Sequence, residues 1–392
     1  MLPTGISSGF VTVVLPYLLT QNNFPVSVTA GIVAFGVSAN LWRFLWGPIV
    51  DISLNLKKWY WIGLLTSIVS LLVLCFTPFT TEGASLLSVI VFISQVAATF
   101  IVLPVNGFMA KSIEETKKGK ASGWYQAGSL AGTGLGGGVG LWLATQFNVG
   151  IAGAVMCAMS LLFAWVIVFV QNIPRHVQEI TILEEVKGIG RDILELIKVP
   201  VALFVIILIM MPIGTGAAGN LWSAIALDWH TGADTVILVT GLLSGGVSAM
   251  GCLAGGLMAD RWGVWVAYFG SGIACACVAF TMAVMPMVPE VYVGGVLCYA
   301  FVMGMAYAAF TATVLFAIGK HNVATKFSLL ASLGNLPVVY MTTINGWVHD
   351  QYSSKLMLIG EAAIGALCVC LLWLVLKWLK HQRFIQSDKV NT

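Results

Sequence analysis

A repeating pattern of long apolar stretches and short polar breaks is the feature that most constrains how this chain can fold. Each stretch is close to the roughly 20 residues that an α-helix needs to cross the hydrocarbon core of a bilayer. A backbone in lipid must satisfy its own hydrogen bonds, so these stretches are expected to be helices. We draw twelve spans, at 2–20, 27–50, 59–79, 84–110, 121–145, 149–171, 199–227, 234–258, 264–286, 290–318, 326–348 and 355–377.

The composition excludes a soluble fold. Of the 392 residues, 59% are hydrophobic and only 9% are charged, whereas soluble domains carry about 25% charged residues. A membrane barrel would instead show short segments of alternating polarity. The eight cysteines all fall in apolar stretches, and we interpret them as packing residues. The expected fold class is therefore an all-α membrane protein.

The basic residues indicate the orientation in the membrane. Of the 19 Lys and Arg residues, all but Arg43 and Lys355 fall in the breaks on one side or in the C-terminal tail. Loops rich in Lys and Arg remain in the cytoplasm. With an even number of spans, both termini are expected to be cytoplasmic.

The longest polar interruption divides the chain into halves. It contains apolar residues at helical spacing, which predicts an amphipathic helix there, with a plain linker as the alternative. The expected layout is a six-helix bundle at 1–171, a cytoplasmic linker at 172–198, a second six-helix bundle at 199–380 and a cytoplasmic tail at 381–392.

Two correspondences indicate that the halves are repeats. The pattern from Gly47 to Asp51 recurs 209 residues later, from Gly256 to Asp260, where Arg261 follows. A set of Lys and Gly residues in span five recurs in span eleven, 206 residues later: Lys120, Gly128 and Gly140 match Lys326, Gly334 and Gly346. Two six-span halves in parallel repeat are the layout of major facilitator transporters.

The second copy, G-x-x-x-D-R-x-G, resembles the cytoplasmic signature loop of the major facilitator superfamily. That resemblance implies a twelve-helix fold of two pseudo-symmetric bundles, with gating roles for Gly47, Asp51, Gly256, Asp260 and Arg261. Glycine permits close helix approach, and charged side chains can pair across the interface. The alternative for Asp51 and Asp260 is helix capping at the membrane edge.

Three further segments resemble the AmpG-like permease branch, at 43–51, 137–144 and 304–330. The resemblance implies a multi-pass permease of the bacterial inner membrane that imports muropeptides by proton symport. The chain departs from that branch at 101–107, which holds no carboxylate, and near Ser129, where the branch has an arginine. A siderophore or acyl-CoA permease therefore remains open. Because Leu2 and Pro3 match a mid-helix position, we also expect the first half of helix one to precede this numbering.

Two ionisable residues lie inside predicted spans without a counterpart in the other half. Ionisable groups in a bilayer are functional candidates because they are costly to bury. Arg43 is expected to bind an anionic group of the substrate, which its planar fork suits; the alternative is a bridge to Asp51 or a carbonyl. Glu361 is expected to carry a proton, because burial favours the protonated carboxyl. The alternative for Glu361 is contact with lipid headgroups or a loop, since span twelve is peripheral.

The spans that would line a cavity are polar but largely uncharged. Residues 212–220 of span seven hold a proline and several glycines, which predicts a broken helix with exposed backbone groups. Gly128, Gly132, Gly136 and Gly140 recur every four residues in span five and predict close helix packing. Asp228 is a second proton-coupling candidate. The substrate-binding candidates are Arg43, Gln95, Asn106, Gln126, Asn220, Trp222, Tyr299, Tyr307 and Asn335.

Other functional classes have less support in the sequence. No phosphate-binding G-x-x-x-x-G-K-[ST] loop is present, so we expect an ion gradient, of protons or another ion, rather than ATP to drive transport. The five histidines are scattered, which indicates neither a metal site nor a cofactor. The alternatives are a membrane enzyme built on the His349–Asp350 pair and a sensor that transports nothing. The expected partners are a small-molecule substrate and membrane lipid but no nucleic acid, and the chain is expected to be a monomer.

Overall fold

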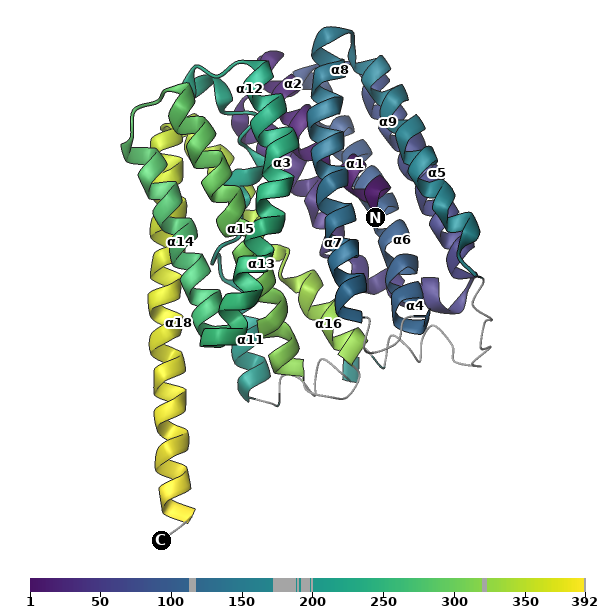
Figure 1. Cartoon of the computed structure of the whole chain (residues 1–392). Coiled ribbons are helices and arrows are strands. Elements are labelled where there is room, and N and C mark those ends of the chain that lie inside the picture. Colours follow the sequence, from purple (N-terminus) through teal and green to yellow (C-terminus); the bar gives the residue numbers. More distant parts are fainter. Residues whose placement is uncertain are drawn as a thin grey trace.

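The computed structural model describes residues 1–112, 118–171, 188, 190–191, 198, 200–318 and 323–390. Within these residues the chain is helical and contains no strand. Figure 1 shows the helices as long rods standing side by side. We call the end of the bundle where α18 finishes the lower face, and the opposite end, where α2, α8 and α12 lie, the upper face (Figure 1).

The first half is built from these elements: α1 (Leu2–Gly9), a π-helical turn (Phe10–Val14), α2 (Leu15–Gln21), α3 (Val26–Val37), a 3₁₀ turn (Ser38–Asn40), α4 (Arg43–Ile52), α5 (Leu56–Phe76), α6 (Ala84–Ser112), α7 (Lys118–Gly134), a π-helical turn (Leu135–Val139), α8 (Gly140–Gln146), α9 (Val149–Ala164) and a 3₁₀ turn (Trp165–Phe169). Asn55 and Asn148 cap the N-termini of α5 and α9 with side-chain oxygens that accept backbone N–H groups at 2.8 Å.

The second half contains α11 (Pro200–Met210), two 3₁₀ turns (Ala217–Asn220 and Ala226–Trp229), α12 (Ala233–Thr235), a π-helical stretch (Val236–Leu243), α13 (Ser244–Trp262), α14 (Val264–Val284), α15 (Pro289–Ile318), α16 (Val323–Leu333), α17 (Leu336–Gln351) and α18 (Ser354–Val390). In Figure 1 this half lies to the left, in green and yellow, and the first half lies mainly to the right.

Ten of the described helical segments are long and apolar enough to cross a membrane. The rod from α7 to α8, and α11 with the irregular stretch that follows it, occupy the two other predicted spans. The all-α membrane fold is therefore confirmed, and twelve spans are consistent with it. Large apolar side chains such as Phe169 and Leu253 are exposed on the outside of the helices, as a lipid environment allows. The predicted amphipathic helix within 172–198 lies outside the described residues.

Span seven is broken, as its proline and glycines predict, but the break is longer than expected. After Met210 the described chain runs to Ala233 without an α-helix. Pro212 removes a backbone donor, while Gly214 and Gly216 have φ values of 58° and 70°, a conformation that costs other L-residues energy. This irregular segment, residues 211–232, is nevertheless in the core, where Trp229 is fully buried.

The glycines of span five make the predicted close contacts. A Cβ at Gly132 would lie 2.4 Å from the carbonyl oxygen of Leu2, and one at Gly136 would lie 2.2 Å from that of Ile6. This stripe therefore packs α7 and its π-helical turn against α1. Gly138, another glycine on this rod, faces the other half of the chain. A Cβ added at Gly241 of the second half would lie 2.5 Å from the Cα of Gly138. The sequence analysis did not identify that second contact.

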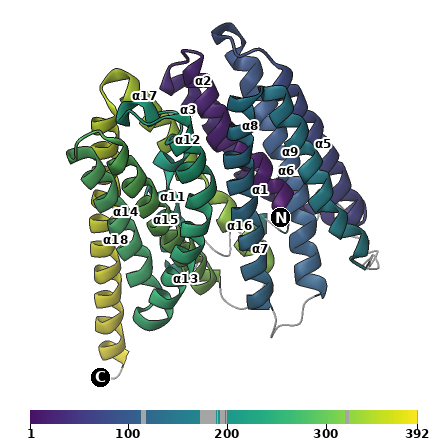
Figure 2. The same ribbon diagram turned by 45° about the horizontal axis from the view of Figure 1, so that its top comes forward.

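The two halves also meet along α3 and α17, which pack against each other. A Cβ at Gly346 of α17 would lie 2.3 Å from the Cβ of Ala30 on α3. Figures 1 and 2 both show α7 beside α13, a further contact between the halves. Glycine is thus placed where the two bundles approach most closely.

Candidate substrate and coupling site

Two clusters of polar side chains in the described part of the chain combine residues from different helices. The first, the Arg43 cluster, consists of Arg43, Asn106, Tyr125 and Tyr307. The second, the Glu361 cluster, consists of Glu361, Tyr299, Asn345 and the backbone of Ala218. The Arg43 cluster draws on both halves of the chain and the Glu361 cluster on the second half.

Arg43 owes its position to an interruption in span two. Helix α3 ends at Val37, a 3₁₀ turn follows, and Arg43 begins α4. A helix N-terminus carries partial positive charge, so a guanidinium there is unfavourable unless an anion is nearby. The Nε of Arg43 is buried, and no described residue accepts a hydrogen bond from it. The site therefore combines a buried donor, the guanidinium charge and the partial positive charge of a helix terminus, all of which favour an anion.

Tyr125 connects Arg43 with two further polar side chains. The hydroxyl of Tyr125, on α7, forms a side-chain hydrogen bond with Asn106 of α6 and lies within electrostatic range of Arg43 and Tyr307. Tyr307, on α15, is 53% exposed, and Asn106 is also exposed. Sequence reasoning identified Arg43, Asn106 and Tyr307 separately but missed Tyr125. Its only signal was its position beside Gln126, another candidate, which is half-buried on α7.

The Glu361 cluster lies inside the second bundle. The Tyr299 hydroxyl donates to Oε1 of Glu361 at 2.5 Å, and the Asn345 amide donates to Oε2. The backbone N–H of Ala218, in the irregular segment, gives a third hydrogen bond to the carboxylate. Glu361 is therefore buried among donors from α15, α17 and the irregular segment.

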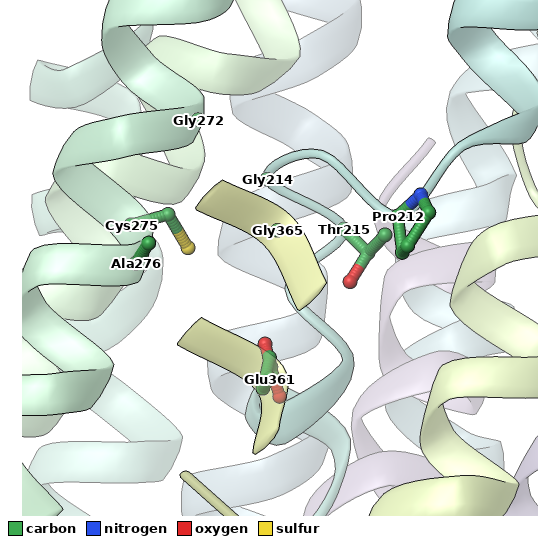
Figure 3. A pocket seen from close by; sticks show the side chains of 8 residues that line it. All are labelled: Pro212, Gly214, Thr215, Gly272, Cys275, Ala276, Glu361 and Gly365. Carbon is green, nitrogen blue, oxygen red and sulfur yellow. The ribbon is translucent and has the colours of Figure 1, made fainter. Parts of the chain in front are cut away.

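A cavity of about 10 Å³ adjoins Glu361, which is room for roughly one water molecule. Figure 3 shows Cys275 and Ala276 on one side of Glu361, with Pro212 and Thr215 of the irregular segment on the other. The break in span seven thus places the Thr215 hydroxyl and non-helical backbone beside a buried carboxyl. Such an arrangement can pass a proton through a single water.

The other substrate-binding candidates have local partners. Gln95 is buried and donates to Ser7 of α1 at 3.2 Å, while Asn335 bonds the Ala331 carbonyl in the preceding helix at 2.8 Å. Asn220 donates to Thr342 of α17 at 3.1 Å. Trp222 is 2% exposed and packs edge-to-face on Tyr299, with ring centres 5.3 Å apart. Asn220 and Trp222 therefore support the Glu361 cluster, whereas Gln95 joins α1 to α6.

Asp228 lies at the upper face, away from both clusters. Its Oδ2 is 2.9 Å from Nε2 of His349 and accepts a hydrogen bond from Ser354. Burial raises the pKa of this carboxyl, but the hydrogen bonds and the nearby histidines outweigh burial, so the pKa of Asp228 lies below its ordinary value. A carboxyl of this kind stays ionised near neutral pH.

The gating candidates lie toward the lower face, and the side chains of all but Asp51 are described. A Cβ added at Gly47 of α4 or Gly256 of α13 would meet no atom within 4 Å. Asp260 and Arg261 are exposed, and no described residue forms a hydrogen bond or ion pair with either. The side chain of Asp51 lies outside the described residues. Among the described residues, Gly47 and Gly256 therefore make no close helix contact, although α4 and α16 pack against each other on this side.

A second hollow, of about 360 Å³, lies between α4, α5 and α6. Its walls are nearly all apolar and include Trp46, Trp59 and Phe100, whose rings stack. Because Ile62 and Ile93 in its lining are exposed, it opens outward toward the lipid. It is not a site for a polar solute.

Comparisons with known proteins agree with this architecture. The chain has a TM-score of 0.70 with the D-xylose–proton symporter, at 16% identity, covering 95% of each chain. It has a TM-score of 0.71 with a partially occluded inward-open form of the xylose transporter XylE from E. coli, at 15% identity and 95% coverage of each chain. With the nucleoside transporter NupG the TM-score is 0.72, at 14% identity and 96% coverage of each chain.

The TM-scores show that the chain shares the fold of these transporters. The sequence identities are too low to indicate its substrate. No curated protein sequence gives a significant match. The family described as the Major Facilitator Superfamily matches residues 1–341, which is most of the chain. Together with the two helical halves that meet along α3 and α17, this match shows that the chain belongs to the Major Facilitator Superfamily.

Proposed function

We propose that this protein is a secondary transporter that binds an anionic group of a polar organic solute at Arg43 and couples its movement to protons at Glu361. Membership of the superfamily supports secondary transport in general. The proposal of an anionic substrate rests on the buried Nε of Arg43. This nitrogen has no described hydrogen-bond acceptor, and Arg43 lies at the N-terminus of α4. Both the guanidinium and the helix terminus attract an anion.

The surroundings of Arg43 support a solute that also carries neutral polar groups. Tyr125 and Asn106 offer a hydroxyl and an amide from the first half, and Tyr307 offers a hydroxyl from the second. A solute held between them would contact both bundles, so it could favour one arrangement of the halves over the other. Of the nine substrate-binding candidates, we retain Arg43, Asn106 and Tyr307 as direct contacts, and we add Tyr125.

Glu361 is proposed as the proton carrier. It is buried in the second bundle, held by Tyr299 and Asn345, and open to a one-water cavity. Protonation turns one carboxylate oxygen into a donor, so at least one of these hydrogen bonds must rearrange. Because Asn345 lies on α17 and Ala218 in the irregular segment, such a rearrangement would act on both. Asp228 is not proposed as a carrier, since its lowered pKa keeps it ionised.

The conformation is proposed to be inward-facing. The halves are in close contact at the upper face, through Gly346 and Ala30, whereas Gly47 and Gly256 near the lower face have open space around them. The basic loops predict that the lower face is cytoplasmic. The protein would then sit in a bacterial inner membrane with both termini inside, as a monomer of two bundles joined by 172–198.

The nearest substrate class by sequence resemblance is muropeptides, which the AmpG-like branch imports. Siderophores and acyl-CoA compounds are the alternatives within that branch. Muropeptides carry carboxylates and acyl-CoA compounds carry phosphates, so an arginine site with a tyrosine and an asparagine near it suits both; among siderophores it suits those with free carboxylates. The choice among the three rests on measured uptake.

Uptake into proteoliposomes tests the proposal. The purified chain would be reconstituted and offered muropeptides, siderophores and acyl-CoA compounds, with and without an inward-directed proton gradient. We expect accumulation of one class that depends on the gradient. Uptake by none of them, with the protein folded, would favour the sensor alternative and refute the transport proposal for these classes.

Two variants separate binding from coupling. Arg43→Ala removes a charged hydrogen-bond donor, which is worth about 1.5–3 kcal/mol, so the affinity for the solute should fall about tenfold to a hundredfold. Lys355→Ala is the matched control, because Lys355 is an exposed cation at the upper face. Glu361→Gln should abolish accumulation against a gradient and leave exchange of labelled for unlabelled solute, with exposed Glu290→Gln as its control. Unchanged accumulation in Glu361→Gln would show that the carrier is elsewhere.

A further inference from the structure

His349 and Asp350 form a contact between the two halves that the proposed function does not use. Asp350 is next to the last residue of α17, in the second half. Its Oδ1 accepts the backbone N–H of Val26 at 3.0 Å, and its Oδ2 accepts the backbone N–H of Ser27 at 2.7 Å. Val26 and Ser27 are the first two residues of α3, in the first half. A carboxylate of one bundle thus caps a helix of the other.

This cap is chemically well matched. The first N–H groups of a helix have no partner within the helix, so they need an external acceptor. The partial positive charge of the helix N-terminus also attracts a carboxylate. Pro25, which precedes α3, offers no N–H group of its own, and α3 has no side-chain cap of its own. The first turn of α3 therefore depends on Asp350 for two of its hydrogen bonds.

His349 fixes the position of Asp350. Its Nδ1 lies 3.0 Å from Oδ1 of Asp350, and its Nε2 lies 2.9 Å from Oδ2 of Asp228. An ionised carboxylate can only accept, so both ring nitrogens must donate, and His349 is held as the imidazolium ion. With both nitrogens occupied, the His349–Asp350 pair has no free base for catalysis. The enzyme alternative for this pair therefore loses its support.

The groups that face His349 are few in the described chain. Asp350 shares its helix, Asp228 comes from the irregular segment, and α18 contributes the neutral hydroxyl of Ser354, which bonds Asp228. His230 acts on Asp228 from two residues further along the chain. Helix α3 contributes the two backbone N–H groups and the hydroxyl of Ser27, which bonds Asp350. The imidazolium thus joins two carboxylates, one on α17 and one on the irregular segment.

The same helix connects this contact to the Glu361 cluster. Asn345, which donates to Glu361, lies four residues before His349 on α17. The two side chains therefore lie on the same face of the helix. The irregular segment also reaches both places, because Ala218 bonds Glu361 and Asp228 bonds His349. A change in the hydrogen bonds of Glu361 can therefore affect the upper face through α17 and through the irregular segment.

We propose that Asp350 and His349 are the gating residues that hold the upper face closed between α3 and α17. Asp350 must release the N-terminus of α3 before the halves can separate there, and His349 keeps Asp350 in place through Asp228. The proposal concerns only how one face is closed, and it stands whether or not Glu361 carries the proton. Its residues are distinct from the lower-face glycine and aspartate pattern of the two repeats.

The test measures the opening of the upper face directly in the full chain. Spin labels would be placed at the exposed positions Asn22 and Lys355, after the exposed cysteines Cys277, Cys298 and Cys370 have been replaced by serine. Pulsed electron resonance of the protein in lipid nanodiscs then gives the distance distribution between the two halves. No substrate is needed, so the result does not depend on the proposed function.

Asp350→Ala and His349→Ala are the informative variants. Loss of a helix cap typically shifts an equilibrium about fivefold, so the ratio of the long-distance to the short-distance population should rise about fivefold in Asp350→Ala and by a similar factor in His349→Ala. Asp234→Ala, at an exposed carboxylate of α12, should leave the distribution unchanged. If His349→Ala does not fold, His349→Gln replaces it. Distributions that match the parent protein in both gate variants would overturn the proposal.

Discussion

Replacing one glycine should open the upper face without touching any charged group. In Gly346→Ala, the new Cβ would lie 2.3 Å from the Cβ of Ala30, 2.9 Å from the carbonyl oxygen of Val26 and 3.1 Å from the Cα of Ser27. Two of these three atoms belong to the backbone of α3, and the third is fixed to it, so none can rotate away. Ordinary contact begins at 3.4 Å. Helix α17 must therefore move about 1.1 Å away from α3.

The cost of such overpacking is about 1–3 kcal/mol. If the closed arrangement bears that cost and the open one does not, the open population gains roughly fivefold to more than a hundredfold. The assay is the distance distribution between labels at Asn22 and Lys355, together with the melting temperature as a check on folding. We expect the long-distance population to grow in Gly346→Ala.

Gly31→Ala is the matched control for this prediction. Gly31 lies on α3 beside Ala30, and a Cβ there would meet no atom within 4 Å. The substitution therefore adds the same methyl group to α3, at the residue next to Ala30, without a clash. A Gly346→Ala distribution equal to that of Gly31→Ala would refute the reasoning that this close approach belongs to the closed state alone.

Three other substitutions test the packing and electrostatics of the irregular segment and the bundle contact. Tyr292→Phe removes the hydroxyl that donates to the Trp222 carbonyl at 2.8 Å and should cost about 1–3 kcal/mol of unfolding free energy, measured by denaturant titration in detergent; no loss would mean that this bond does not hold the segment. Gly241→Ala places a Cβ 2.5 Å from the Cα of Gly138 and should lower the melting temperature, and a melting temperature equal to the parent's would contradict the contact between the halves. Because the pKa of Asp228 is lowered in the folded protein, its stabilising effect is present above the unfolded pKa, near 3.9, and is lost as the pH falls through the folded pKa. The melting temperature of Asp228→Asn should therefore lie below that of the parent near pH 5 to 6, where His349 is also charged, and converge with it in more acidic solution as Asp228 is protonated. A difference that persists unchanged in strongly acidic solution would contradict the sign of the shift.

Much of the fold follows from local properties of the sequence. The length and apolarity of each stretch predict a helix that spans the membrane, because lipid leaves the backbone no other partner. The same logic locates the break in span seven, since Pro212 and the glycines after it cannot maintain a regular helix. The four-residue glycine spacing in span five also predicts its close packing, which Gly132 and Gly136 make against α1.

The site depends on contacts that no local pattern reports. Tyr125 gains its role only because α7 places it beside Arg43 and Asn106, and Glu361 is buried only because Tyr299 and Asn345 reach it from two other helices. Sequence reasoning left Glu361 open between a proton carrier and a headgroup contact, since span twelve by itself does not show which of its sides faces the bundle.

The sequence by itself therefore determined that this chain is a helical membrane protein in two related halves, with Arg43 and Glu361 as its unusual residues. Hydrophobic length and residue spacing are properties of one segment at a time, so they can be recognised without the fold. Only the tertiary structure decided that Asp350 of the second half caps α3 of the first and that His349 joins two carboxylates. The contacts of Asp350 with α3 and of His349 with Asp228 join residues more than 100 positions apart, and hydrogen-bond geometry over such separations is set by how whole helices pack.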